Sequence, residues 1–383
     1  MKSKVTRRGV LKGSSALALS LASTRVLSAA PAAEAVTPEL IAAAKKEGKV
    51  VHYTSVDLPL AEKVGKAFEA KYPGISVRIE RTGAERVFTR IGQEAASRIY
   101  ACDVVQSSDA AHFVVWKRDG MLAPYVPEDV AKHFPAEHKD PDGLFASYRV
   151  YLCVMARNTD LVKAEDAPKS YADLLDPKWA GKIVKAHPGY SGTILTATYQ
   201  TARDVGWDYY EKLAKQRVMQ VQSASDPPKK LALGERAIMA DGIEYGIFQL
   251  KEDGKPVDVI YPSEGSPLII GPNGVLKNAP NPNAARLFQS FMLSAECQQY
   301  NVDLGGLRSA HALVKDKPGR TPMKEIKIMK DDAAAKIDDV DGVKALAHHG
   351  TKPGIGVAGE EGAVGDEADH TPARGAVTLK EFP

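Results

Sequence analysis

Cysteine is scarce in this sequence, with only three in 383 residues. Three are too few for a disulfide framework, and the spacing of Cys102, Cys153 and Cys297 matches no metal site. Cys102 and Cys153 lie in or beside apolar runs, so we interpret them as small buried hydrophobic residues.

A large excess of one charge is also absent. The formal net charge is +3, but six basic residues and only one acidic residue, Glu34, lie within the first 35 positions. The rest of the chain carries a net charge of about −2, which gives no electrostatic basis for binding nucleic acid or a membrane surface. The contents of hydrophobic (44%) and charged (26%) residues are typical of a soluble globular protein, and the length predicts two or three domains.

The motifs of common catalytic sites are missing as well. The sequence has no G-x-S-x-G, no Walker A loop, no H-E-x-x-H and no strand–G-x-G-x-x-G–helix unit. Its histidines are scattered, and we interpret the pair His348 and His349 as solvated side chains rather than a metal site. We therefore expect a protein that is not an enzyme and that needs no cofactor.

The N-terminus carries a pattern typical of export signals. Arg7 and Arg8 precede a mildly apolar stretch over residues 13–27, and residues 33–35 form an A-x-A cleavage site. The pattern resembles a twin-arginine (Tat) signal. A transmembrane anchor is disfavoured because the stretch is short, rich in Ser and interrupted by Arg25. We expect residues 1–35 to be a signal peptide and the mature protein to be periplasmic.

Short β-branched runs then alternate with amphipathic stretches. The sequence predicts strands over residues 49–53, 75–79, 103–105, 150–155, 183–184, 237–239 and 267–275, and helices over residues 60–68, 85–99, 207–215 and 283–300. Strands alternating with helices predict an α/β fold with mostly parallel sheets. Residues 350–383 are rich in Gly and Pro without periodicity, so we interpret them as a disordered tail.

Polar loops follow several of the predicted strands. Ligands of open α/β sheets bind beyond the carboxyl ends of the strands, and helix starts offer free N–H groups that suit an anion. Any single loop could instead be an ordinary N-cap, but several together favour a binding cleft. Arg86 would add a fork for a carboxylate or phosphate, unless it is only a surface residue of its helix. The candidate ligand-binding residues are Thr54, Ser55, Asp57, Arg86, Ser107, Ser108, Ser191, Gly192, Thr193, Glu244 and Tyr245.

Several short segments occur in an order and spacing that are specific together. They are residues 51–55, 67–68, 72–75, 103–105, 174–183 and 191–193. With these segments the chain resembles, from about Ala42 to Val314, the periplasmic solute-binding proteins of ABC importers, in the branch that includes ferric-iron, thiamine, phosphonate and sugar-phosphate binders. The resemblance implies two α/β lobes, each a mostly parallel sheet flanked by helices, with a ligand cleft between them that closes by a hinge.

The resemblance also implies how the chain is divided. Lobe 1 is expected over residues 36–147 and 263–314, and lobe 2 over residues 148–262. Residues 315–349 are expected to form a C-terminal helical segment. The crossings between lobes are expected near residues 147–155 and 261–268.

The ferric binders of this family hold iron with a His after the first strand, a Glu after the third and a pair of Tyr at the late crossing. The corresponding positions here are Asp57, Ser108, Glu244 and Tyr245, so only one of the four ligands is kept. Fe(III) accepts carboxylate and phenolate oxygens, so Asp57, Glu244 and Tyr245 remain an alternative metal site. The anion-binding turn of the iron proteins is kept better, at residues 191–193.

The sequence and the resemblance are compatible with three functions. The leading hypothesis is a monomeric, non-enzymatic receptor that binds a small phosphate-, phosphonate- or carboxylate-bearing solute and delivers it to the ABC permease subunits in the inner membrane. The second is capture of ferric iron. The third, a periplasmic enzyme on the same fold, is disfavoured because no nucleophile–base or metal-catalysis motif is present.

Overall fold

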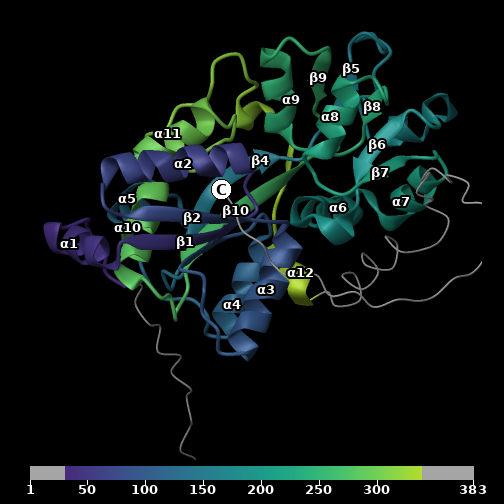
Figure 1. Ribbon diagram of the computed structural model, residues 1–383. Coiled ribbons are helices and arrows are strands. Elements are labelled where there is room, and N and C mark those ends of the chain that lie inside the picture. Colours follow the sequence, from purple (N-terminus) through teal and green to yellow (C-terminus); the bar gives the residue numbers. More distant parts are fainter. Residues whose placement is uncertain (1–30, 339–383) are drawn as a thin grey trace, which may run out of the picture.

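The computed structural model describes residues 31–338 (Figure 1). The twin-arginine motif, His348 and His349, and the predicted tail at 350–383 lie outside the described residues. Within 31–338 the chain forms two sheets, each flanked by helices, which sit side by side in Figure 1. No helix of this part has the length and apolar character needed to cross a lipid bilayer.

Lobe 1 is built on the first sheet, whose strands lie in the order β11-β10-β3-β1-β2, with β4 paired to β10. Strand β1 is parallel to β2 and β3, whereas β10 is antiparallel to β3 and β4. The strands are β1 (Lys49–Thr54), β2 (Ser76–Arg81), β3 (Val104–Gln106), β4 (Ala146–Leu152), β10 (Ser266–Val275) and β11 (Ile328–Met329). The helices are α1 (Pro38–Glu47), α2 (Leu58–Lys71), α3 (Ala84–Ala96), α4 (Ala110–Arg118), α5 (Glu128–His133), α10 (Pro282–Met292) and α11 (Ala295–Asp303).

Lobe 2 is built on the second sheet, with the order β7-β6-β8-β5-β9. Strand β6 is parallel to β7 and β8, and β5 is antiparallel to β8 and β9. The strands are β5 (Met155–Asn158), β6 (Ile183–Ala186), β7 (Met219–Val221), β8 (Ile238–Met239) and β9 (Val257–Ile260). The helices are α6 (Gly192–Val205), α7 (Trp207–Ala214), α8 (Asp226–Ala232) and α9 (Glu244–Glu252).

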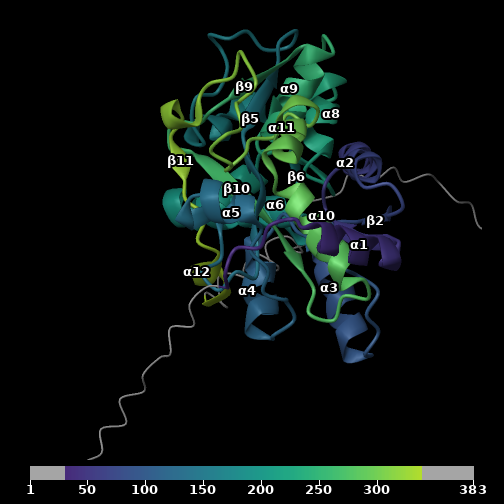
Figure 2. The same cartoon turned by 90° about the vertical axis from the view of Figure 1, so that its left-hand side faces the viewer.

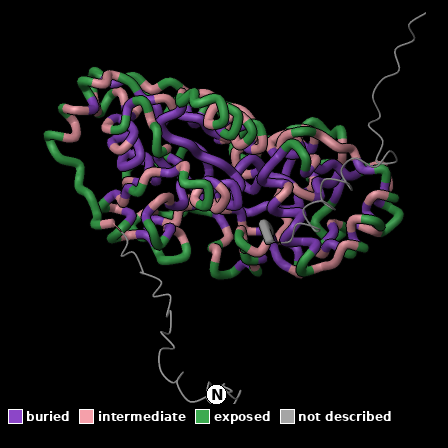
Figure 3. The backbone as a smooth tube through the Cα atoms, turned by 90° about the horizontal axis from the view of Figure 1, so that it is seen from below, coloured by how far each residue is buried: buried purple, intermediate pink, exposed green. Residues whose placement is uncertain are grey.

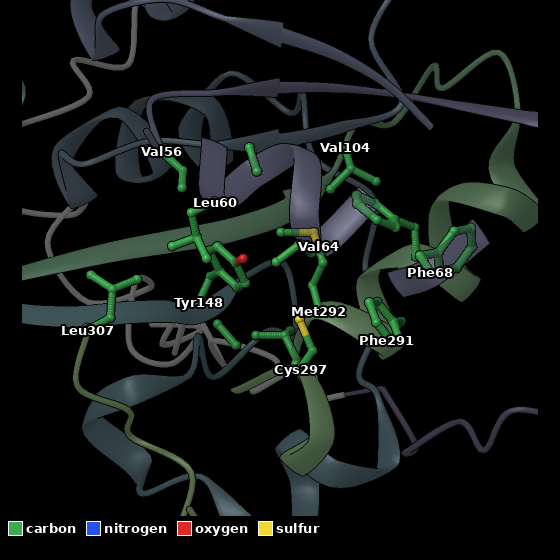
Figure 4. Packing of buried hydrophobic residues seen from close by; sticks show 14 of the residues in the cluster. Val56, Leu60, Val64, Phe68, Val104, Tyr148, Phe291, Met292, Cys297 and Leu307 are labelled. Carbon is green, nitrogen blue, oxygen red and sulfur yellow. The ribbon is translucent and has the colours of Figure 1, made fainter. Parts of the chain in front are cut away.

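Each lobe is stabilised internally by the packing of apolar helix faces. In lobe 1, Phe68 of α2 packs edge-on against Phe288 and Phe291 of α10, with ring centroids 5.0 and 5.5 Å apart (Figure 4). Buried segments run through the interior of both lobes (Figure 3). Cys102 and Cys153 are free and buried, as the sequence predicted.

The chain changes sheets at two places. It leaves lobe 1 between Leu152 and Met155 and returns between Ile260 and Ser266. The first change falls after the expected boundary at residue 148, because β4 pairs with β10 up to Leu152.

A C-terminal strap, residues 315–338, then contacts both lobes. Lys317 pairs with Glu252 of α9 at 2.6 Å, and the Lys330 carbonyl accepts a hydrogen bond from Arg203 of α6. The strap adds β11 to β10 and ends in α12 (Ala333–Asp338), which packs on α4 of lobe 1 (Figures 1 and 2). This segment was expected to be helical, but up to α12 it is mostly irregular, with a turn at residues 318–320, a 3-10 turn at Met323–Glu325 and the short strand β11. Two prolines and the strand pairing of β11 explain the difference.

Candidate ligand-binding site

A cavity of about 140 Å³, here called the inner cavity, lies between the two lobes. Lobe 1 contributes Ser55, Asp57, Arg81, Gly83, Ala84, Arg86, Ser108, Arg149 and Tyr151, and lobe 2 contributes Tyr190, Ser191, Gly192, Thr193, Gln222, Ser223, Ala224, Ser225, Ile243 and Tyr245. Most of the wall is therefore polar or charged.

The parallel strands bring these residues together. Ser55 follows β1, Arg81 ends β2, Ser108 follows β3, and Ser191 follows β6. Carboxyl ends of parallel strands meet at one edge of a sheet, and each lobe turns that edge toward the inner cavity.

The N-terminus of α6 faces the inner cavity. Ser191 is its N-cap, and the Ser191 hydroxyl accepts a hydrogen bond from the Ile194 N–H at 3.4 Å. A long helix leaves its first N–H groups without backbone partners and carries a partial positive charge there. An anion in the cavity would meet both.

Arg149 is the most informative residue of the site. It lies in β4 with only 2% of its surface exposed. Its guanidinium makes one hydrogen bond, from Nη2 to the Ser55 hydroxyl at 3.0 Å, and lies over the Tyr151 ring. Its Nε has no partner, and no carboxylate in the described part of the chain lies within ion-pair distance. A buried charge without a counterion is unfavourable, so this position favours an anionic ligand.

Two further guanidinium groups stand nearer to solvent. Arg81 donates from Nε to the Val56 carbonyl at 3.3 Å, and its Nη2 lies 3.8 Å from Asp57 Oδ1. Arg86, in the first turn of α3, is exposed. Three guanidinium groups therefore line a cavity with one carboxylate, that of Asp57.

The lobes are joined across the cavity by two hydrogen bonds. The Tyr245 hydroxyl donates to Asp57 Oδ2 at 3.0 Å, and the hydroxyls of Tyr151 and Thr193 lie 2.7 Å apart. Burial, and secondarily the charge of Asp57, raises the pKa of Tyr245 well above its ordinary value. The Tyr245 phenol is therefore protonated at neutral pH, as a donor to Asp57 must be.

Backbone proximity also joins the lobes. A Cβ atom added at Gly192 of α6 would lie 3.0 Å from the Cβ of Ala84 and 3.1 Å from that of Asp109, both in lobe 1. These distances are tighter than ordinary contacts, so a larger side chain here would push the two lobes apart by a few tenths of an ångström or more. The lobes are therefore in direct contact beside the inner cavity.

Eight of the candidate residues chosen from the sequence line the inner cavity. They are Ser55, Asp57, Arg86, Ser108, Ser191, Gly192, Thr193 and Tyr245. Thr54 and Ser107 lie elsewhere: the Thr54 hydroxyl donates to Gln106 Oε1 at 3.0 Å, and the Ser107 hydroxyl is 2.8 Å from His112 Nδ1. Both residues are fully buried inside lobe 1, so their hydroxyls serve its internal hydrogen bonds.

Glu244 is also outside the cavity. Its carboxylate is fully buried and accepts hydrogen bonds from Nε and Nη2 of Arg308 at 3.0 and 2.8 Å, and from the Tyr261 hydroxyl at 2.7 Å. Arg308 lies 64 positions further along the chain, so the sequence pattern did not reveal this partner. The alternative metal site of Asp57, Glu244 and Tyr245 is therefore not assembled: only Asp57 and Tyr245 meet.

Sequence reasoning missed several residues of the wall, chiefly Arg81, Arg149, Tyr151, Ser223 and Ser225. Arg149 carried a usable signal, because it is a charged residue directly before the predicted strand over residues 150–155. Arg81 carried a weaker one, because it lies two residues after the predicted strand over residues 75–79. Ser223 and Ser225 lie in a loop whose position depends on lobe 2 as a whole.

One group of side chains in the described range has the composition of a metal site. Ligand atoms of Glu85, Asp109 and His112 lie within 4.8 Å of one another. However, His112 Nε2 is 3.3 Å from Glu85 Oε1, and His112 Nδ1 is engaged by Ser107. The histidine is thus paired within lobe 1.

Comparisons with known proteins agree with this fold. A family model described as "Bacterial extracellular solute-binding protein" matches residues 102–332. The solved structure of the periplasmic binding protein AfuA from Actinobacillus pleuropneumoniae, with exogenous fructose-6-phosphate bound, is 26% identical with a TM-score of 0.71. The match covers 79% of this chain and 97% of AfuA.

Two further proteins are similar at lower identity. Iron-bound HitA from Pseudomonas aeruginosa is 22% identical, with a TM-score of 0.70 over 79% of this chain and 99% of HitA. Iron uptake protein A1 of Synechocystis sp. (strain ATCC 27184 / PCC 6803 / Kazusa) is 24% identical over 241 residues, covering 59% of this chain and 66% of that protein. The structural neighbours are two-lobed periplasmic binding proteins, which confirms the fold class predicted from the sequence.

Proposed function

This chain belongs to the bacterial extracellular solute-binding proteins, as the resemblance implied, and we propose that it captures a small solute by a phosphate, phosphonate or carboxylate group. It is a periplasmic receptor of an ABC importer, so its partners are a solute and that importer's permease subunits. The proteins it resembles bind and deliver solutes and are not enzymes.

The proposal is carried by Arg149. Its guanidinium is buried at the wall of the inner cavity without a carboxylate partner among the residues described. The N-terminus of α6 adds donors on the opposite wall, and Arg81 and Arg86 add positive charge nearer to solvent. Similarity to AfuA, solved with fructose-6-phosphate, supports a phosphate group among the three anions.

Native mass spectrometry of protein purified without denaturation, followed by calorimetric titration of the solute found, tests this function. The expected result is a bound mass that corresponds to an anionic solute. Arg149→Gln should weaken its binding at least tenfold, because a hydrogen bond to a charged group is worth roughly 1.5–3 kcal/mol.

Arg157→Gln is the matched control. Arg157 is another largely buried arginine, but it lies in lobe 2 away from the cavity and is paired with Asp258 at 3.3 Å. This variant should bind the solute like the parent. A neutral or cationic solute, or equal effects of the two substitutions, would refute the proposal.

Ferric iron is a second candidate, favoured by the adjacent oxygens of Asp57 and Tyr245. Two oxygen ligands leave most of the coordination sphere to other donors, and three nearby guanidinium groups disfavour a cation. Titration with ferric citrate should therefore produce no strong charge-transfer band in the visible spectrum. A band that disappears in Tyr245→Phe would establish iron binding instead.

We further propose that the protein is exported by the Tat pathway and acts as a monomer. Residues Arg7 and Arg8 motivate the first claim. Replacing both by Lys should leave precursor in the cytoplasm, and an unchanged periplasmic yield would refute it. Mass photometry of the mature protein tests the second.

A further inference from the structure

A second and larger cavity adjoins the inner cavity. This outer chamber has a volume of about 590 Å³ and lies between α2, α8, α9 and the turn at Leu304 and Gly305. The two cavities share a wall formed by Asp57, Arg81, Ser223, Ser225, Ile243 and Tyr245. A molecule in the inner cavity therefore meets these residues on the side that faces the outer chamber.

The volumes of the two cavities suit different parts of a ligand. Pockets for organic ligands usually measure about 300–1,000 Å³, so 140 Å³ suits an anionic group but little more. The outer chamber is within the usual range. Its wall mixes both signs of charge, from Lys63, Lys229 and Asp253, with apolar side chains. Such a wall matches a polar body without a strong net charge.

Asp57 lies in the shared wall with one carboxylate oxygen that lacks a close hydrogen-bond partner. It occupies the N-cap position of α2, yet its side chain makes no capping hydrogen bond. Its Oδ2 accepts from Tyr245, whereas Oδ1 has only Arg81 Nη2 nearby, at 3.8 Å. The side chain is 35% exposed, so Oδ1 can accept a further hydrogen bond from a molecule in the cavity.

A carboxylate at this wall repels the anion that the arginines attract. Tyr245 and Arg81 offset part of this repulsion, and a hydrogen-bond donor on the bound molecule at the same place would offset more of it. Resting on the proposed function, we propose that the solute is bifunctional. Its anionic group occupies the inner cavity, and a hydroxyl or ammonium group on its body donates to Asp57 at the entrance to the outer chamber.

Three matched pairs of probes test this by calorimetric titration. They are inorganic phosphate with glycerol 3-phosphate, methylphosphonate with 2-aminoethylphosphonate, and propionate with β-alanine. In at least one pair, the donor-bearing member should bind the parent protein about ten to a hundred times more tightly. The first two pairs together separate a hydroxyl donor from an ammonium donor.

Asp57→Ala should abolish this preference while leaving the plain anion bound as tightly or more tightly. Because Asp57 makes no capping bond, the variant should fold, and its melting temperature checks this. Tyr245→Phe is the matched control, since it removes the same inter-lobe hydrogen bond but keeps the carboxylate. It should retain the preference, and Asp57→Asn should reduce it.

The titrations distinguish failure of the bifunctional-solute proposal from failure of the proposed anion-binding function. If both members of every pair bind the parent equally, or if Asp57→Ala weakens all probes alike, the bifunctional solute is refuted and anion binding stands. If no probe of any pair binds the parent, the proposed anion-binding function fails as well.

Discussion

Arg149 is expected to favour ligand binding but to lower the stability of the solute-free protein. The parent protein buries an unpaired guanidinium, and removing such a charge is often neutral or stabilising. We predict that Arg149→Gln leaves the free energy of unfolding of the solute-free protein unchanged or raises it. Arg157→Gln should lower it by about 1 kcal/mol, because it removes the hydrogen bond to the Val162 carbonyl and one of the two ion pairs of Asp258, which keeps Lys251. Urea unfolding after removal of the solute measures both, and a large loss in Arg149→Gln would mean a structural role.

His52 makes stability depend on pH. It is fully buried in β1 with Nδ1 3.1 Å from the Val104 carbonyl, and burial lowers its pKa from 6.5 to about 4. The unfolded chain therefore takes up a proton at a higher pH than the folded protein. Stability should be fully present above pH 6.5 and fall as the pH drops toward 4, by on the order of 3 kcal/mol from this residue.

Unfolding by urea at pH 7.5 and pH 5 checks this effect. His138 and His311 also have lowered pKa values, chiefly through burial, and act in the same direction. The informative quantity is thus the difference between the parent and His52→Phe, which should lose less stability on acidification. Equal losses in both proteins would contradict the assignment to His52.

At the scale of elements, the start of α6 controls how closely the lobes approach. We predict that Gly192→Val weakens solute binding at least tenfold with little change in melting temperature. The atoms that the new side chain meets, in Ala84, Ser108 and Asp109, belong to the other lobe, so each lobe keeps its own packing.

Small-angle scattering should show Gly192→Val to be more open than the parent in the presence of solute. Gly92→Val is the control, because a Cβ at Gly92 has nothing within 4 Å. Parent-like affinity in Gly192→Val would show that the contact is dispensable.

The order of helices and strands also shows which parts of the fold and of the site could be predicted from the sequence. Alternating strands and helices predicted the α/β class, and loops after strands located Ser55, Ser108 and Ser191, since backbone direction alone decides where such loops lie. The pattern could not separate Ser108 from Ser107, because adjacent residues of one loop face opposite sides. Nor could it reveal that Glu244 is neutralised by Arg308, since that pairing depends on the packing of distant segments.

At the scale of the molecule, the C-terminal strap connects the lobes a further time, outside the two crossings. It is held to α9 through Lys317 and to α6 through Arg203, and α12 rests on α4. Any hinge motion between the lobes must therefore bend the strap or release one of these contacts. We therefore expect the strap to limit the angle through which the cleft opens.

The position of β10 in the first sheet determines when lobe 1 can fold. Lobe 2 is one continuous stretch, from Met155 to Ile260, so its contacts can form as soon as that stretch is complete. Lobe 1 must wait for residues 266–275, because β10 lies between β3 and β4. Until then both partner strands expose unpaired edges, which favour aggregation. The N-terminal part of lobe 1, residues 36–152, is therefore expected to be completed last, and we predict that its long-range pairing with β10 slows folding.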